Sequence, residues 1–125
     1  MKKYRLYQVD SFTKNPFIGN PAGVVANADG LTEAQMKQIA REMNNSETAF
    51  IFSSDSPDYD IEIRFFTPKA EVPLCGHATI ASHYIRAMEG TAAPGRHIQK
   101  TKAGLLPVDI ICSNGGYSII MTQGK

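Results

Sequence analysis

The sequence predicts an α+β domain in which a β-sheet curls around a central helix. Three observations support this fold class. Short segments rich in branched and aromatic residues alternate with turn residues, which is typical of β-strands. One later segment is apolar around most of its helical circumference and therefore belongs in a protein interior. A chain of 125 residues, 42% of them hydrophobic, is long enough for one domain with its own core.

The first third of the chain predicts two strands and a helix. Residues 4–10 are rich in aromatic and branched side chains and predict the opening strand. Residues 12–21 contain two Asn-Pro steps and predict a loop, after which residues 23–26 predict a short strand. Thr32 and Gln35 have the spacing of a capping box, so a helix with one apolar face is expected to begin at Thr32.

The middle of the chain predicts two neighbouring strands. Residues 48–52 are a mostly apolar run, which suits a strand buried on both faces. Residues 59–65 alternate between apolar and polar side chains. This pattern predicts a half-buried strand that runs antiparallel to the preceding one.

The interior helix is predicted over residues 76–88, where only a narrow strip is polar. That strip consists of Ser82, His83 and Arg86. Further strands are predicted at residues 97–102, 105–111 and 117–122. His83 and His97 have no evident partner in the sequence, and we expect both at the surface or rim of the domain.

Composition argues against several classes of protein. Thirteen basic and twelve acidic residues leave a formal charge of +1, and no basic run exceeds a pair, so a nucleic acid is not expected as a partner. No stretch approaches the roughly 20 apolar residues of a membrane span. Two cysteines are too few for a disulfide framework or a multi-ligand metal site. These features predict a cytoplasmic protein without a metal or another cofactor.

Glu47 is the first candidate for a catalytic residue. Glutamate is a poor strand former, yet Glu47 directly precedes a strand-forming run. Partial burial of such a carboxyl group favours its protonated form and would help it to exchange protons with carbon. The alternative is that Glu47 caps a strand end in solvent or bonds the preceding loop.

The start of the interior helix is the second candidate. The backbone amides of Gly76, His77 and Ala78 would point at an anion, and the His77 side chain could bind or protonate it. Glycine at position 76 would let a ligand approach the backbone closely. A histidine satisfied by a backbone carbonyl is the alternative for His77.

Three other residues carry weaker signals. Cys75 could act as a thiolate base, because a helix N-terminus lowers the pKa of a thiol, but a lone cysteine is more often a small apolar filler. Cys112, in a strand before a turn, is expected to be structural. Asn20 lies in a Gly-Asn-Pro turn and could bind a carboxylate with its amide, although an ordinary turn explains the tripeptide equally.

Taken together, these segments resemble the phenazine-biosynthesis isomerase family, the PhzF-like proteins, which are related to diaminopimelate epimerase. Five ordered motifs carry the resemblance: residues 7–13, 17–25, 39–50, 63–68 and 71–79. The resemblance implies a diaminopimelate epimerase-like domain, with a curved mixed β-sheet wrapped around a long central helix. It also implies that Glu47 is the proton-shuttling glutamate and His77 the substrate-contacting histidine of a cofactor-independent isomerase. The substrate would be a small-molecule carboxylate.

The resemblance also implies that part of the site lies elsewhere. Family members have two similar domains with the active site between them, and this chain corresponds to the N-terminal one. We therefore expect residues 1–125 to need a C-terminal domain, or a second copy in a homodimer, for full catalysis. Two alternatives stay open: an amino-acid epimerase or racemase with Cys75 as base, and a non-catalytic domain that binds a small anion or a partner protein.

Overall fold

A single mixed sheet contains all the strands of the part of the chain that the structure describes. The computed structural model describes residues 4–9, 22–43, 47–113 and 116–121. Its strands are β1 (Leu6–Val9), β2 (Ala22–Val25), β3 (Glu47–Ser53), β4 (Ile61–Phe66), β5 (Glu71–Val72), β6 (Gly95–Thr101), β7 (Gly104–Ser113) and β8 (Gly116–Met121). Its helices are α1 (Glu33–Met43) and α2 (Gly76–Glu89). Every strand and helix predicted from the sequence is present, with shifted ends, and β5 is an addition.

The strand order is β1-β2-β3-β4-β6-β7-β8, with β5 paired to β4 outside this path. The pairs β2–β3 and β4–β6 are parallel, and the other pairs are antiparallel. Parallel neighbours need a crossover connection, and α1 and α2 supply the two crossovers. The predicted antiparallel pairing of β3 with β4 is confirmed.

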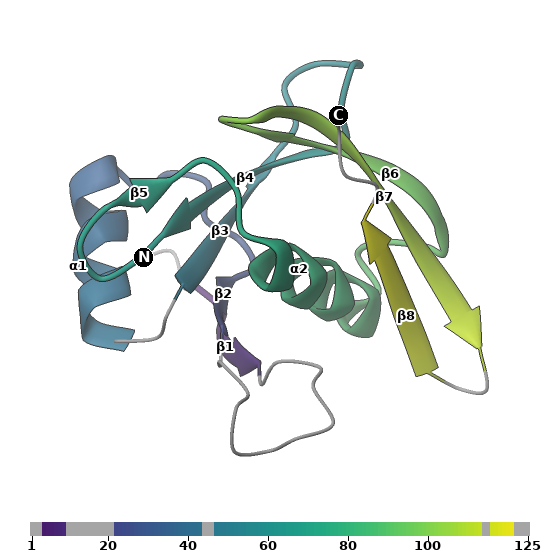
Figure 1. Cartoon of the computed structure of the whole chain (residues 1–125), viewed down its shortest axis with the longest axis horizontal. Coiled ribbons are helices and arrows are strands. Elements are labelled where there is room, and N and C mark those ends of the chain that lie inside the picture. The colour runs from purple at the N-terminus through teal and green to yellow at the C-terminus, as the bar shows by residue number, and fades with distance from the viewer. Residues whose placement is uncertain (1–3, 10–21, 44–46, 114–115, 122–125) are drawn as a thin grey trace.

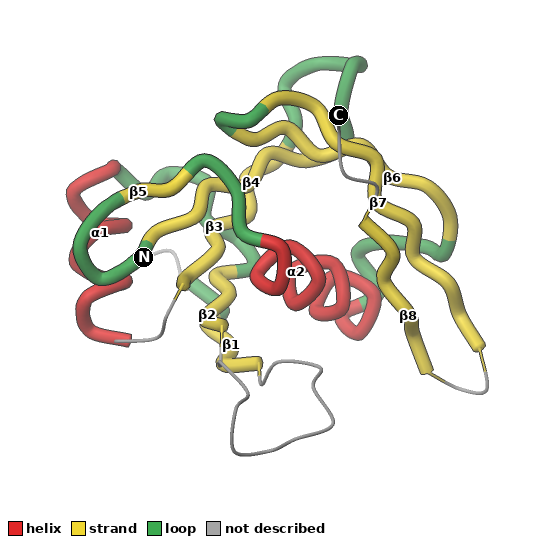
Figure 2. The backbone as a smooth tube through the Cα atoms, viewed as in Figure 1, coloured by secondary structure: helices red, strands yellow, loops and turns green. Residues whose placement is uncertain are grey.

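The two helices lie against opposite faces of β3. Side chains alternate between the faces of a strand, so Phe50 packs with the α1 layer whereas Ala49 and Ile51 pack with α2. The predicted burial of β3 on both faces is therefore confirmed. The sheet bends around α2, which contacts β2 and β3 on one side and β7 and β8 on the other (Figures 1 and 2).

The fold prediction holds as a mixed, curled sheet with two helices. The helix α2 has 14 residues, which is an ordinary length. It ends at Gly90, whose φ of 78° is the left-handed conformation that glycine adopts without strain. Neither described helix combines the length and the apolar character that a membrane-spanning segment needs.

The capping box predicted for α1 is present in full. The amide of Gln35 donates to Thr32 Oγ1 at 3.1 Å, and the amide of Thr32 donates to Gln35 Oε1 at 2.9 Å. Both partners are local in sequence, which is why the pattern could be recognised from two residue types at the right spacing.

The prediction that His83 lies at the surface or rim of the domain is wrong. Its side chain is fully buried, as is that of Ser82, and Arg86 is only 8% exposed. His83 faces β6 instead of solvent, because β6 carries a buried polar partner, Gln99, on its inner side. His97 is partly exposed, as expected of a rim residue, but it has a partner: its Nε2 lies 2.8 Å from the carbonyl oxygen of Ala93.

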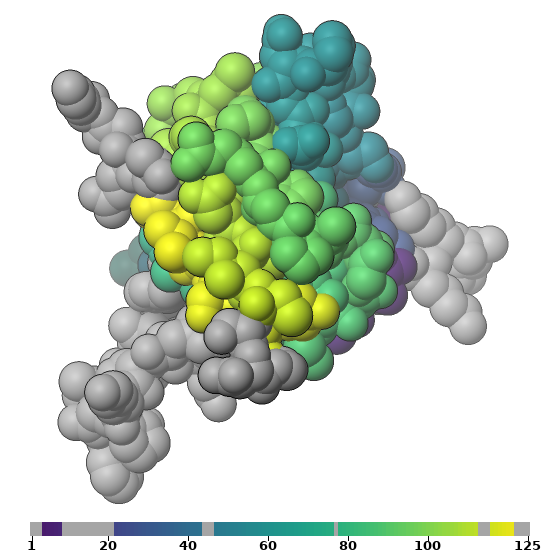
Figure 3. All heavy atoms as spheres, turned by 90° about the vertical axis from the view of Figure 1, so that its right-hand side faces the viewer, coloured from purple at the N-terminus to yellow at the C-terminus, as the bar shows by residue number. Residues whose placement is uncertain are grey.

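The strands β6, β7 and β8, lime to yellow, occupy much of the side of the molecule turned toward the viewer in Figure 3. Val108 and Ile110 of β7 point inward and are buried, whereas Leu105 and Ile111 are exposed. The alternation of β7 thus separates a core-facing row from an outward one. The structural role expected of Cys112 finds no support in burial, since its thiol is free and exposed.

Candidate active site

Glu47 is the first residue of β3 and pairs with Ala22 of the parallel strand β2. Side chains two and four residues apart in a strand point to the same face. Ala49 and Ile51 pack against α2, so Glu47 also lies on the α2 face of the sheet. The residue is partly exposed as a whole, but its Oε1 atom is buried. The carboxyl group therefore lies on the inner side of the curled sheet.

The start of α2 lies at the same end of the sheet as Glu47. Val72 of β5 pairs with Phe65 of β4, and Phe65 in turn pairs with Ala49, two residues after Glu47. From β5 the chain passes directly into the first turn of α2 (Figure 1). Leu74 and Cys75 pack against the same core cluster as Ala49. Glu47 and the helix start thus share one face and one end of the sheet.

The first turn of α2 has the features of an anion site. Its N-cap, Cys75, is extended and makes no side-chain capping hydrogen bond, and the first turn contains no acidic residue. The first bond along the helix runs from the amide of Thr79 to the carbonyl of Cys75 at 3.0 Å. The amides of Gly76, His77 and Ala78 precede it, so the helix itself cannot satisfy them.

The backbone at Gly76 is open to approach. Among the described residues, the nearest neighbour of a Cβ atom added there would be Met121 Cε, 3.8 Å away, which is ordinary van der Waals contact. Glycine has no side chain that would keep a ligand away from the backbone. The binding role of Gly76 stays a prediction.

Two predicted binding groups lie outside the described part of the structure: the whole of Asn20 and the side chain of His77. Their roles stay predictions. Cys75 is a partly buried cysteine at the start of α2 that forms no disulfide, and its role also stays a prediction. Among the described residues, no group of three or more histidine, cysteine or acidic side chains could hold a metal ion.

An ionic cluster that the sequence did not reveal holds the segment before α2. Arg64 of β4 donates to both carboxylate oxygens of Glu71, at 2.8 and 2.7 Å, and also to Glu33 of α1 at 2.8 Å. Lys102 adds a second ion pair with Glu71 at 3.0 Å. Hydrogen bonding to Arg64 lowers the pKa of Glu71 despite partial burial. The cluster ties β5, and with it the entrance of α2, to the rest of the sheet.

A second polar cluster lies deeper along α2. Arg86 Nη1 lies 3.2 Å from His83 Nδ1, and His83 Nε2 lies 2.8 Å from Gln99 Oε1. A guanidinium can only donate, so Nδ1 accepts and the ring proton sits on Nε2, where it is donated to Gln99. Burial lowers the pKa of His83 to about 4. His83 is therefore a neutral, fully buried histidine at physiological pH.

The residue pattern and comparisons with known proteins agree. The family model for phenazine biosynthesis-like proteins matches residues 9–125. The chain belongs to this family. It is 64% identical, over its whole length, to an uncharacterized isomerase of Clostridium acetobutylicum, and it covers 41% of that protein.

Solved structures give the same assignment. The fold matches the crystal structure of a PhzF-family phenazine biosynthesis protein of Bacillus anthracis with a TM-score of 0.84, at 41% identity over 97% of this chain and 40% of the other. A hydroxyproline epimerase of Agrobacterium vitis has a TM-score of 0.69 at 12% identity, with 93% of this chain and 40% of the other covered, which is a likeness of fold alone. The chain thus spans about two fifths of the length of its relatives.

Proposed function

We propose that this chain is the N-terminal domain of a cofactor-independent isomerase that moves a proton on a carbon atom near a carboxylate. In this proposal α2 is the central helix of an epimerase-like domain. The observation that carries the proposal is the position of Glu47 on the same face and at the same end of the sheet as the uncapped start of α2. Relatives named as isomerases support the reaction class.

Each group has a defined task in this reaction. The carboxylate of Glu47 takes a proton from carbon, and the electron pair left behind moves toward the neighbouring carboxylate or its conjugated ring. The amides of Gly76 and Ala78, with His77 and, more weakly, Asn20, hold the anion and stabilise the charge that develops. Glu47 then returns the proton to a different carbon or a different face, so no oxidant, metal or other co-reactant is consumed.

The proposal includes a second wall for the site. A C-terminal domain or a second copy of this chain would cover the end of the sheet where Glu47 and the start of α2 lie. This cover would exclude water from Glu47 and from the first amides of α2. Electrostatic stabilisation by amides is much stronger in such a water-poor site. We therefore expect the 125-residue chain alone to turn over slowly, or not at all, compared with a two-domain relative.

The test is Glu47→Gln in the full-length protein that contains this domain, with Glu62→Gln as the matched control. Glu62 is partly exposed on the neighbouring strand β4. Loss of the proposed proton-transfer group should lower kcat by about 10²–10⁴-fold, whereas the control should keep its activity. The readout is the isomerisation of a dihydro-hydroxyanthranilate or a related carboxylate. It is monitored through the exchange of the substrate proton with deuterium from deuterated water. Unchanged exchange in Glu47→Gln would exclude Glu47 as the base.

An epimerase or racemase that uses Cys75 as base is the second candidate. The position of Cys75 at the N-cap of α2 favours it, since the helix start stabilises a thiolate. Cys75→Ser and Cys112→Ser separate the two candidates, because only Cys75 lies at the site. An epimerase should lose racemisation of an amino acid in the first variant alone, whereas the proposed isomerase should keep most of its activity in both.

A further inference from the structure

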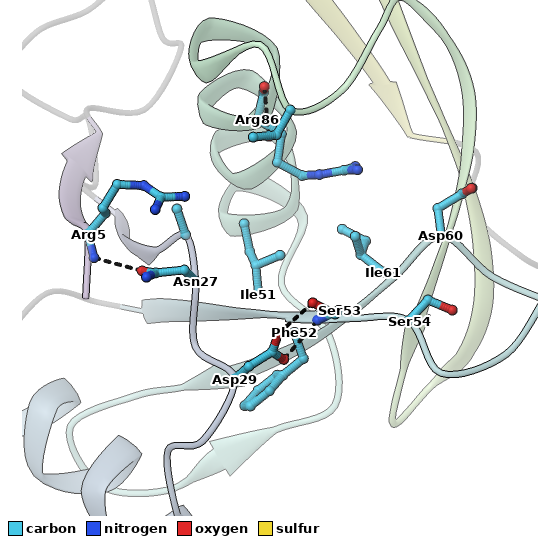
Figure 4. A pocket seen from close by; sticks show the side chains of 12 residues that line it. Arg5, Asn27, Asp29, Ile51, Phe52, Ser53, Ser54, Asp60, Ile61 and Arg86 are labelled. Atoms are coloured by element: carbon cyan, nitrogen blue, oxygen red, sulfur yellow. Dashed lines mark hydrogen bonds between the residues drawn. The ribbon is translucent and has the colours of Figure 1, made fainter. Parts of the chain in front are cut away.

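A cavity of about 410 Å³ lies at the end of the sheet opposite to Glu47 (Figure 4). Its wall includes the last residues of β3, the rim residue Asp60, and Arg86 and Thr91 at the end of α2. From Glu47 to Ser53 a strand advances about 20 Å. The cavity is therefore separate from the proposed active site, and nothing in the proposed function uses it.

Two of the charged groups in this wall already have strong partners. Arg5 donates to Glu89 at 2.7 and 3.2 Å, and the hydroxyl of Tyr7 donates to the same carboxylate at 2.5 Å. Asp29 accepts from the amide of Ser53 at 2.9 Å and from the hydroxyl of the same residue. Arg5 is therefore paired with an opposite charge, and both carboxylate oxygens of Asp29 accept hydrogen bonds from Ser53.

Arg86 differs from these groups. It is 8% exposed, and its guanidinium contacts the neutral His83 at 3.2 Å. No carboxylate among the described residues forms an ion pair with it. Burial lowers the pKa of Arg86, with the more distant Asp60 acting in the opposite direction. Buried charges in proteins are normally paired, because removing an ion from water is costly.

Asp60 lies on the other side of the same cavity. It is exposed, and its Oδ2 accepts from the amide of Ile98 at 2.6 Å. In Figure 4 the Arg86 side chain extends across the cavity on the side where Asp60 lies. The cavity therefore presents a buried cation and an exposed carboxylate, with Ser53, Ser54 and Thr91 as neutral polar residues between and around them.

We propose that this cavity binds a small zwitterion of amino-acid type, with its carboxylate at Arg86 and its ammonium at Asp60. A guanidinium can bind a carboxylate through two parallel hydrogen bonds, which would supply the anion that Arg86 lacks. A simple anion would be repelled by Asp60 and a simple cation by Arg86, so only a molecule with both charges is complementary to the two groups. The volume lies within the range of small-molecule sites.

Three related probes test the proposal: L-alanine, propionate, which lacks the ammonium group, and ethylamine, which lacks the carboxylate. Each is titrated into the isotopically labelled 125-residue chain, and the amide signals of Ser53, Ser54 and Thr91 and the Nε–H signal of Arg86 are followed by NMR. L-alanine should shift these signals saturably, with an affinity at least tenfold higher than that of propionate or ethylamine. Absence of saturation, or equal affinity for all three probes, overturns the proposal.

Two variants and one control locate the binding. Arg86→Gln should lower the affinity for L-alanine at least tenfold, whereas Arg96→Gln should not change it, because Arg96 is exposed and paired with Asp109. Asp60→Asn keeps an oxygen for the amide of Ile98 and should remove the preference for L-alanine over propionate. This exposed variant keeps the proposal testable if Arg86→Gln does not fold. Shifts confined to the first turn of α2 would assign the probe to the proposed active site and contradict the inference.

Discussion

The two helices of this domain begin in opposite ways. The start of α1 is closed by the capping box of Thr32 and Gln35 and carries an acid, Glu33, in its first turn. The start of α2 has neither a side-chain cap nor a first-turn acid, and a glycine opens the space above it. Capping and a first-turn acid stabilise a helix, whereas uncapped amides are available to a ligand. The start of α1 is stabilised by its own side chains, whereas the start of α2 leaves its first amides open to a ligand.

The helices also differ beyond their first turns. Buried Met36 and Ala40 give α1 one apolar face against the sheet. In contrast, α2 carries polar side chains into the interior, among them His83 and Arg86. Buried polar groups cost stability unless they are satisfied, so α2 depends on specific partners such as Gln99. The four predictions below test this contrast in order of decreasing expected effect.

The largest expected effect is the pH dependence that His83 gives to folding. His83 stays neutral in the folded protein down to pH about 4, whereas an exposed histidine in the unfolded chain is protonated below about pH 6.5. Between these values the unfolded chain binds the extra proton, so the free energy of unfolding should fall with decreasing pH. The slope should approach 1.4 kcal/mol per pH unit, or about 3 kcal/mol over the window.

Urea denaturation at several pH values measures this slope, and His83→Gln should remove most of it between pH about 6.5 and about 5. Glutamine can still donate to Gln99, which makes the variant a fair test of the proton rather than of the contact. A variant with the same slope as the wild type would show that another group titrates on unfolding.

The next effect concerns the ionic cluster that holds the entrance of α2. Arg64→Met removes the guanidinium that binds both carboxylate oxygens of Glu71, whose side chain is only 9% exposed. This loss should lower the free energy of unfolding by about 2–3 kcal/mol. Arg96→Met removes an exposed pair, in which the arginine side chain is 63% exposed, and should cost less than about 1 kcal/mol. Equal losses in thermal denaturation would contradict the special role of Arg64.

A side-chain cap added to α2 should stabilise the protein and weaken the binding of a carboxylate ligand. Cys75→Asp would supply an acceptor to the amides of the first turn, stabilising the helix by about 1 kcal/mol while repelling a carboxylate ligand. We expect at least tenfold weaker binding of 2-aminobenzoate in calorimetric titration, with Cys112→Asp as the control that changes neither quantity. Unchanged binding in Cys75→Asp would mean that the first-turn amides do not hold the anion.

The smallest effect is the loss of the existing cap. Thr32→Ala removes the oxygen that accepts from Gln35 and should lower the free energy of unfolding by about 1 kcal/mol. Binding of 2-aminobenzoate should not change, because α1 lies on the other face of the sheet. A change in binding would show that the start of α1 affects the ligand site on the other face of the sheet, and would contradict the different roles given to the two helices.

Much of the fold could be predicted because its signals are local. The apolar run of β3, the alternation of β4 and the capping box of α1 each depend on neighbours within a few residues, and all three are confirmed. The short strand β5 carries too few residues for a pattern. The burial of His83 depends on Gln99, sixteen residues away, and no local signal identifies such a partner.

Only part of the candidate site could be predicted. The sequence places Glu47 directly before an apolar strand and Gly76 at the start of a predicted helix, whereas the face that Glu47 occupies and the missing cap of α2 come from the structure. Their common end of the sheet depends on the pairing of β5 with β4, which the sequence does not reveal. The clusters around Arg64 and Arg86 were missed because ion pairs and cavities join residues that are distant along the chain.

The most direct test of a shared site at Glu47 and α2 is an NMR titration of the 125-residue chain with 2-aminobenzoate. The signals to follow are the side-chain carboxyl carbon of Glu47 and the backbone amides of Gly76 and Ala78. If both face one binding site, all three signals shift together and yield the same Kd. Shifts of the amides without any change at Glu47, or different Kd values for the two groups, would contradict the account.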